Sequence, residues 1–228
     1  DAMIKSGQKP GVIGNTTSEF IDFLAKSGQK YWQILPVSPT DEYGSPYAGI
    51  SAFAGNINLL DQATMKKVIS ECDGPQSKRA AEYQAFLARN SYWLDSYAAF
   101  RAIKDLLGEG VWQEWPKQYR SWSQELLERP ELTQAIELHQ KRQFAFDVIW
   151  GQTLAEARAK GIQIIGDMPM FVSEDSADVW AHPELFALDD TGHTELQAGA
   201  PADAFSQDGQ LWGNPTYNWQ AHKDEGYR

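Results

Sequence analysis

Cysteine is nearly absent from this chain of 228 residues, and Cys72 is its only thiol. A single cysteine excludes an internal disulfide framework and a zinc site made of several cysteines, and it fits a reducing compartment. No apolar run approaches the roughly 20 residues that a membrane-spanning helix needs, and residues 1–30 lack the pattern of a secretory signal peptide. These absences predict a cytoplasmic protein.

Positive charge is also scarce, because 20 Lys and Arg stand against 31 Asp and Glu, which gives a net charge of −11. Such a chain repels phosphate backbones and anionic lipids, so we expect no nucleic-acid or membrane partner. No P-loop or dinucleotide fingerprint occurs, and without a G-x-S-x-G motif nucleophilic serine chemistry has no support. The histidines lack metal-ligand spacing, so we expect no metal site. The histidines are His139, His182, His193 and His222. His139 lies in a predicted helix, where we expect it to be partly exposed.

Apolar and aromatic residues are plentiful. Hydrophobic residues make up 42% of the chain and charged residues 22%, which is enough to form a core and excludes a disordered chain. The aromatic residues include nine Trp, nine Tyr and ten Phe. Tryptophan in such excess either builds the core or offers flat apolar surfaces to a ligand with polar edges.

A helix followed by a strand is expected twice. Residues 18–28 predict a helix with Ser18 as its N-cap, and the apolar run 31–37 predicts a buried strand. The same order returns in a long helix over about 131–159 and a second buried strand within 161–171. Strands joined by helical crossovers are parallel, which predicts an α/β fold. The apolar stripe of the first helix is expected to consist of Phe20, Phe23 and Leu24.

Each predicted strand leads into a polar loop containing Gly and Pro. Ligands of parallel α/β folds collect at the carboxyl ends of the strands, so we expect 36–50 and 166–175 to lie side by side and to form a site. Two strands are too few for a closed barrel, which needs eight strands and about 250 residues. The sequence therefore resembles part of a barrel, with a mostly helical stretch from about 80 to 160 between the two strands.

The candidate site residues are carboxylates, hydroxyls and aromatics in these loops. Asp167 either caps the loop after its strand or lines a pocket, while Asp175 is expected to cap a helical turn at 176–180. The tracts YGSPYAG and GQLWGNP carry hydroxyls and an aromatic that either bind a ligand or form ordinary turns. Together these side chains indicate a carbohydrate site, with Tyr43, Ser45, Tyr47, Phe205, Trp212 and Trp219 as its candidates.

Five tracts in order resemble one enzyme family. They are YWQILPVSPT (31–40), SPYAGISAFAGN (45–56), GIQIIGDMPMFV (161–172), DSADVWAHPELFALDDTG (175–192) and GQLWGNPTYNW (209–219). On these tracts the chain resembles the amylomaltases, which are 4-α-glucanotransferases of the α-amylase clan. The resemblance implies a partial (β/α)8 barrel with a helical insertion subdomain. It divides the chain into a first barrel part (1–60), the insertion (61–140) and a barrel continuation (141–228).

The resemblance also implies an activity, namely transfer of α-1,4-glucan segments to glucose or glucan acceptors. The family uses a retaining double displacement with an Asp nucleophile, a Glu acid/base and a further Asp, and it needs no cofactor. Maltooligosaccharides or other α-1,4-glucans are then the expected partners. The substrate-binding residues carried over by matching motifs are Tyr43, Ser45, Tyr47, Asp167, Asp203, Phe205, Trp212 and Asn214.

Three departures from the family pattern stand out. The tract Y-G-D-S-P-Y lacks its acid between Gly44 and Ser45, although Asp41 and Glu42 come just before. In the lid tract P-P-D-Y-F-S, Ala204 replaces an aromatic residue. The family's R-I-D-H-F-R-G-like nucleophile strand, and the strands with its other two carboxylates, find no match in residues 1–228. We therefore expect these carboxylates beyond residue 228, and we expect the chain by itself to show no turnover.

Other interpretations stay open at this point. The same substrate-binding residues suit a glucan-binding fragment without catalytic activity. The same clan also contains α-glucan hydrolases. Incubation with maltotriose separates these possibilities, because a transferase makes glucose together with longer maltooligosaccharides, whereas a hydrolase makes only shorter products.

Overall fold

The computed structural model describes residues 11–41, 44–74 and 77–227, which form two compact units. The first unit consists of the described residues up to Pro39, together with Ala54–Ser91 and Leu138–Met168. The second consists of Thr40–Phe53, Tyr92–Glu137 and the chain from Pro169 onward. The chain therefore passes repeatedly from one unit to the other, and after the two strands it enters the second unit at Thr40 and at Pro169.

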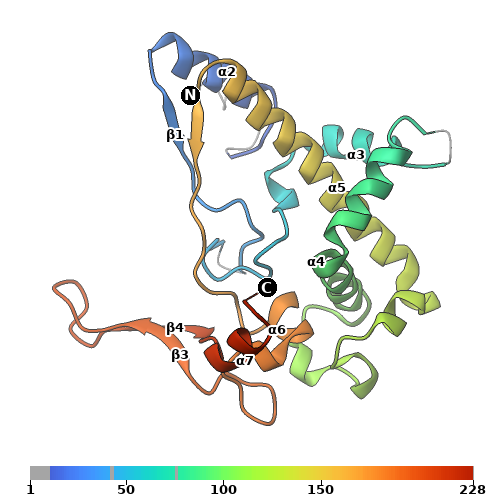
Figure 1. The fold of residues 1–228 in the computed structure, drawn as a ribbon, viewed down its shortest axis with the longest axis vertical. Helices are drawn as coiled ribbons and strands as arrows, with labels where there is room; N and C mark the ends of the chain where they lie inside the picture. The colour runs from blue at the N-terminus through green and yellow to red at the C-terminus, as the bar shows by residue number, and fades with distance from the viewer. Residues whose placement is uncertain (1–10, 42–43, 75–76, 228) are drawn as a thin grey trace. The chain divides into compact units, whose positions relative to one another are not determined.

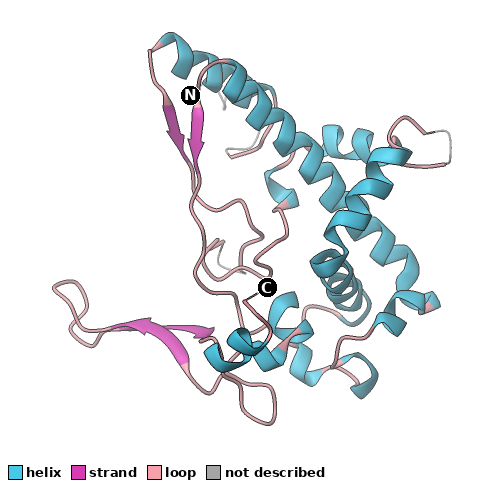
Figure 2. Ribbon diagram, in the orientation of Figure 1, coloured by secondary structure: helices cyan, strands magenta, loops and turns pink. Residues whose placement is uncertain are grey.

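The first unit contains a parallel pair of short strands (Figures 1 and 2). β1 (Tyr31–Gln33) pairs with β2 (Gln163–Ile165), and Trp32 lies opposite Ile164. The helix α2 (Asn15–Lys26) precedes β1, and α5 (Pro130–Ala159) precedes β2. The predicted helix–strand repeat with parallel strands, and with it the α/β class, is thus confirmed. These elements share a small apolar core that consists of Ile21, Leu24, Ala157 and Ile162.

Two details of the predicted first helix are wrong. α2 begins at Asn15 with Gly14 as its N-cap, while the Ser18 hydroxyl donates a hydrogen bond to Glu156 Oε2 at 2.8 Å. A hydroxyl inside the first turns can reach a neighbouring helix, so its residue type alone did not fix the cap. Phe23 is 61% exposed, because the buried face of α2 runs through Ile21 and Leu24.

The expectation of two buried strands is also wrong. β1 and β2 have three residues each, and both carry an exposed–intermediate–exposed pattern. Within the described chain each strand pairs only with the other. Large apolar side chains therefore stay in solvent where further strands or helices would be needed to cover them. The exposed apolar side chains on or next to these strands are Tyr31, Leu35 and Ile165.

Helices dominate the chain between the strands, as predicted. After η1 (Ile57–Leu59) come α3 (Gln62–Ser70), α4 (Ala80–Leu107) and α5. His139 on α5 is buried, with only 4% exposure, so the expectation of partial exposure is wrong. No helix in the described part of the chain is long and apolar enough to span a membrane.

The second unit has an aromatic core. Trp180 is fully buried and packs against the rings of Phe100, Trp115 and Trp122 at centroid distances of 5.3 to 5.9 Å within this cluster. The Trp180 indole donates to the Tyr119 carbonyl at 2.9 Å, which satisfies the polar atom of the buried ring. For these tryptophans the core interpretation is therefore the correct one.

Short elements surround this core. Three 3₁₀ helices, η2 (Trp112–Glu114), η3 (Lys117–Tyr119) and η4 (Gln124–Glu128), connect α4 to α5. They are followed beyond β2 by α6 (Ala177–Ala181) and η5 (Pro183–Leu185). An antiparallel hairpin of β3 (Gln197–Ala200) and β4 (Gln210–Pro215) then leads to α7 (Trp219–Asp224), as Figure 1 shows.

Candidate functional site

The two loops that follow the strands meet in the second unit. Gly49 and Val172 form a parallel backbone bridge, and the Ser173 amide donates to the Gly49 carbonyl at 3.0 Å. The Ala177 amide extends the contact by donating to the Ile50 carbonyl, also at 3.0 Å. The expectation that 36–50 and 166–175 lie side by side is therefore confirmed at these residues. This backbone pairing holds the two loops together and so places their side chains near one another.

A pocket of about 420 Å³ opens beside these paired loops. We call it the Tyr47 pocket. It brings together three elements that are distant in sequence: the 41–48 loop, the 170–171 segment and strand β4. Four of the predicted site residues therefore share one cavity, whose lining is Asp41, Ser45, Tyr47, Ala48, Met170, Phe171, Trp212 and Asn214.

A tight turn shapes the first wall of the Tyr47 pocket. Asp41 Oδ1 accepts a hydrogen bond from the Ser45 amide at 2.7 Å, and Gly44 provides the left-handed backbone with φ of +81°. The Ser45 hydroxyl in turn accepts from the Tyr47 amide at 3.3 Å. Asp41 was not among the predicted site residues. The signal was nevertheless present in the sequence, because Asp41 stands three residues before Gly44, the glycine after which the family tract carries its acid.

Strand β4 supplies the opposite aromatic surface. Trp212 is 42% exposed, its ring lies 6.2 Å from that of Phe171, and its indole donates to Gln210 Oε1 at 3.0 Å. The neighbouring Asn214 is buried, and its Nδ2 donates to the Val172 carbonyl at 2.8 Å. The Asn214 amide thus fastens β4 to the second loop, which is a structural role that motif matching did not reveal.

The predicted lid residues lie on the loop between β3 and β4. Asp203 Oδ1 accepts hydrogen bonds from the amides of Phe205 and Ser206 at 2.8 and 2.7 Å, which makes this carboxylate the organiser of its own turn. The Phe205 side chain is 97% exposed. In the described chain neither Asp203 nor Phe205 lines the Tyr47 pocket.

Two further candidates, Asp167 and Trp219, do not line the Tyr47 pocket. Asp167 belongs to the first unit, and its Oδ1 accepts a hydrogen bond from the Met168 amide at 2.9 Å. That contact agrees with the interpretation of Asp167 as a loop cap, while its role toward a substrate stays a prediction. Tyr43 lies outside the described residues. Trp219 is 65% exposed on α7, where its ring packs against Tyr217 and His222.

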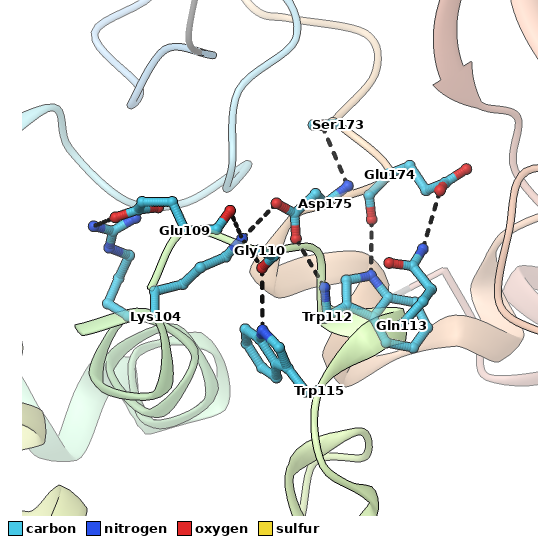
Figure 3. Close-up of polar contacts among 10 residues, drawn as sticks. Lys104, Glu109, Gly110, Trp112, Gln113, Trp115, Ser173, Glu174 and Asp175 are labelled. Atoms are coloured by element: carbon cyan, nitrogen blue, oxygen red, sulfur yellow. Dashed lines mark hydrogen bonds and ion pairs between the residues drawn. The ribbon is translucent and has the colours of Figure 1, made fainter. Parts of the chain in front are cut away.

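A buried lysine holds the second loop in place from behind (Figure 3). Lys104 Nζ pairs with Asp175 Oδ2 at 2.5 Å and donates to the Gly110 carbonyl at 2.8 Å. The Trp112 indole donates to the Glu174 carbonyl at 3.0 Å, so α4 and η2 both fix this segment. The expectation that Asp175 caps 176–180 is wrong. Ser176 is the N-cap of α6, whereas Asp175 neutralises the buried ammonium group.

Glu174 links the same loop to a turn at 189–193. Its carboxylate accepts from the Thr194 amide at 2.7 Å and lies 2.9 Å from His193 Nδ1. Burial opposes ionisation of Glu174, but these hydrogen bonds prevail and hold its pKa below the usual value. The hydrogen bond between His193 and Glu174 also raises the pKa of His193. The described residues contain no group of three or more His, Cys, Asp or Glu that could hold a metal ion.

Comparison with known proteins identifies the family. The family model of glycoside hydrolase family 77, described as 4-alpha-glucanotransferase, matches residues 5–76 and 62–228. The chain belongs to this family. The predicted resemblance is therefore confirmed over nearly the whole chain.

Two relatives in this family share more than a third of their aligned residues with the chain. A 4-alpha-glucanotransferase of Thermus thermophilus is 37% identical over 95% of this chain and 50% of its own length. One from Aquifex aeolicus is 38% identical, with 96% of this chain and 51% of the relative covered. The chain thus spans about half the length of these curated family members.

Solved structures agree with the fold. Amylomaltase from Streptococcus agalactiae, in complex with acarbose, matches with a TM-score of 0.82 and 36% identity over 95% of this chain and 51% of that structure. Amylomaltase from Corynebacterium glutamicum has a TM-score of 0.69 at 17% identity, covering 93% of this chain and 34% of its own, and it supports the fold alone.

Proposed function

We propose that the protein containing this chain is a 4-α-glucanotransferase that transfers α-1,4-glucan segments to glucose or glucan acceptors with retention of configuration. Family membership supports the reaction class, and the observation that carries the proposal for this chain is the Tyr47 pocket. It places hydroxyls and a carboxylate next to aromatic rings, on loops that follow two parallel strands. Pyranose rings need both kinds of surface, because their faces are apolar and their edges carry hydroxyl groups.

In this proposal Trp212 and Phe171 contact the apolar face of a glucose unit. Ser45, Tyr47 and Asp41 contact its hydroxyls, with Asp41 supplying the acid that is missing after Gly44. The turn that fixes Asp41 to the Ser45 amide supports this arrangement, since it holds the carboxylate within the pocket lining before any ligand arrives. Asn214 contributes by fastening β4, and Tyr43 and Asp167 remain candidate contacts.

The chain contributes part of a (β/α)8 barrel of the α-amylase type in this proposal. It divides into a first barrel part (1–60), a helical insertion (61–140) and a barrel continuation (141–228). The parallel β1–β2 pair and the match to amylomaltase structures support this division. The nucleophile, the acid/base and the third carboxylate are then supplied by sequence outside residues 1–228, because the family's motifs for them have no counterpart here.

The β3–β4 loop serves as a lid over the acceptor side. Phe205 supports this role, because a ring that is 97% exposed at the tip of a hairpin has its apolar surface available for a sugar or for a closing contact. Exclusion of water by such a lid favours attack of a sugar hydroxyl on the glycosyl intermediate. Ala204 reduces the apolar area of this lid, which we expect to cost acceptor binding about 1 kcal/mol or less.

We further propose a cytoplasmic protein whose partners are maltooligosaccharides or other α-1,4-glucans. Cys72 is unpaired and buried, which suits a reducing compartment. The structure of the Streptococcus agalactiae amylomaltase with acarbose supports a saccharide as the ligand of the matching residues in this chain.

The test is incubation of the 228-residue chain with maltotriose, combined with calorimetric titration. We expect binding without turnover, and we expect Trp212→Ala to weaken that binding by about tenfold. The control is Phe23→Ala, which removes an exposed ring on α2 in the first unit. Production of glucose and longer maltooligosaccharides by the chain itself would contradict the proposed location of the carboxylates. Shorter products alone would indicate a hydrolase, and absence of saccharide binding would refute the glucan-binding role.

A further inference from the structure

A second, larger pocket lies in the second unit beside α6 and α7. Its volume is about 570 Å³, which is within the range of small-molecule sites. It shares no lining residue with the Tyr47 pocket. We call it the Tyr92 pocket, and the residues on which the inference depends are Phe53, Tyr92, Trp93, Tyr217, His222 and Glu225.

One wall of the Tyr92 pocket is made of aromatic rings. Phe53 stacks on Trp93 with centroids 6.2 Å apart and meets Tyr92 edge-on at 5.6 Å. Both outer rings are open to solvent, since Phe53 is 53% exposed and Tyr92 is 67% exposed. Rings held in mutual contact yet left uncovered form a rigid apolar platform, and such a platform binds a flat apolar surface with little loss of side-chain entropy.

The other side of the pocket carries polar atoms of α7 and the residue that follows it. His222 Nε2 is buried and has no hydrogen-bond partner among the described residues, whereas Glu225 Oε1 makes no hydrogen bond and lies 3.6 Å from His222 Nδ1. Asp178 also lines this side, and its Oδ2 accepts from the Ala52 amide at 3.1 Å. Burial raises the pKa of Asp178 to about 6. A ligand that brings several hydroxyls would satisfy these atoms, because a hydroxyl both donates and accepts.

The two pockets meet at one pair of stacked rings. Tyr217 lines the Tyr92 pocket, and its ring lies 5.8 Å from that of Phe171 with an interplanar angle of 17°. Phe171 lines the Tyr47 pocket. The Tyr217 hydroxyl donates to the Met170 carbonyl at 2.8 Å, which fixes the shared wall. The second pocket is therefore adjacent to the first but is formed by different residues.

We propose that the Tyr92 pocket is a second saccharide site, which takes a glucose unit of an α-1,4-glucan independently of the Tyr47 pocket. The sugar face packs on the platform of Phe53, Tyr92 and Trp93, and its hydroxyls contact His222 and Glu225. The identity of the ligand as a glucan rests on the proposed function, whereas the pocket and its unpartnered His222 Nε2 do not.

The test uses maltose and the indole N–H signals of the protein in ¹H–¹⁵N spectra. Trp93 reports on the Tyr92 pocket and Trp212 on the Tyr47 pocket, and replacement of each tryptophan by Phe assigns its signal. We expect maltose to shift both signals. In Tyr92→Ala the affinity reported by Trp93 should fall by at least about tenfold, while the affinity reported by Trp212 stays unchanged. Tyr92 is mostly exposed, so its removal leaves the core intact.

The matched control is Trp212→Ala, which should leave the maltose response of Trp93 in place. The inference is overturned if Trp93 does not respond over the range that saturates Trp212, or if its response disappears in Trp212→Ala. It is also overturned if Tyr92→Ala binds at Trp93 as tightly as the unaltered protein. Failure of the proposed function looks different, because then the Trp212 signal does not respond to maltose.

Discussion

Lys104 is a charged side chain inside an aromatic shell. It is 3% exposed, and its ammonium group lies 5.3 and 5.7 Å from the ring centroids of Phe100 and Trp115. Its position among buried residues is tolerated because Asp175 neutralises the charge and the Gly110 carbonyl accepts a hydrogen bond from the ammonium group. At the scale of single residues, this lysine therefore ties the core of the second unit to the loop that backs the Tyr47 pocket.

We expect Lys104→Met to lower the free energy of unfolding by about 2 kcal/mol, because Asp175 loses the partner that compensates its partial burial. Urea titration measures the change. The matched control is Arg89→Met, which breaks an exposed ion pair with Asp147 and should cost less than about 1 kcal/mol. Equal losses in the two variants would contradict the structural role of Lys104. The double variant Lys104→Met with Asp175→Asn should recover part of the loss.

The turn at 189–193 is an element that depends on protonation. Asp189 Oδ1 accepts from the amides of Thr191 and His193, so the turn organises itself, and Glu174 then anchors it through His193 and Thr194. The raised pKa of His193 and the lowered pKa of Glu174 mean that folding favours the charged forms of both. The anchor is thus an ionic contact whose strength follows pH.

We expect amide hydrogen exchange at Thr194 to reveal this dependence once the intrinsic effect of pH on exchange is subtracted. The His193 contribution is complete below its unfolded pKa, near 6.5, and is lost as pH rises through the higher folded value. The Glu174 contribution is present above its usual pKa, near 4.5, and is lost as pH falls through the lower folded value. Protection at Thr194 should therefore be greatest between about pH 4.5 and 6.5.

Glu174→Gln is the matching variant, and we expect it to flatten the pH profile of Thr194 protection. His193→Asn should remove the loss of protection above neutral pH while leaving the loss in acid. A profile that is the same in both variants and in the unaltered chain would show that the ionic contact does not anchor the turn.

At the scale of the whole molecule, apolar surface remains uncovered. Side chains of β1, β2 and the adjoining residues are exposed, and in the described chain the edges of both strands away from each other are unpaired. Exposed strand edges and apolar patches promote association between chains, and a net charge of −11 opposes it only by long-range repulsion.

We therefore expect the isolated 228-residue chain to self-associate. Size-exclusion chromatography with light scattering measures this, and raising the salt concentration should increase association as charge repulsion is screened. Ile165→Lys replaces one of the exposed apolar side chains and should reduce association, whereas Phe23→Lys on α2 is the control. A single monomer peak with a cooperative melt would contradict this prediction.

Local sequence patterns were sufficient for much of the fold. The long helical stretch and the order of helix and strand follow from the periodicity of apolar residues. Parallel pairing of β1 and β2 follows from the crossover rule, and the family follows from five tracts in register. In each case the determining interaction joins residues that are close in sequence, or it is fixed by the handedness of the chain.

Other features depend on which distant residues come into contact. The sequence could not show that Ser18 reaches Glu156 rather than its own helix, or that Asp175 pairs with Lys104 rather than capping α6. Motif matching indicated Tyr47 and Trp212 but not Asp41, and it could not reveal that Asn214 fastens β4 to Val172. Hydrogen bonds and ion pairs of this kind are chosen by three-dimensional proximity and burial. The residue types of the site were thus set by the sequence, while only the tertiary structure decided which side chains line a pocket and which support it.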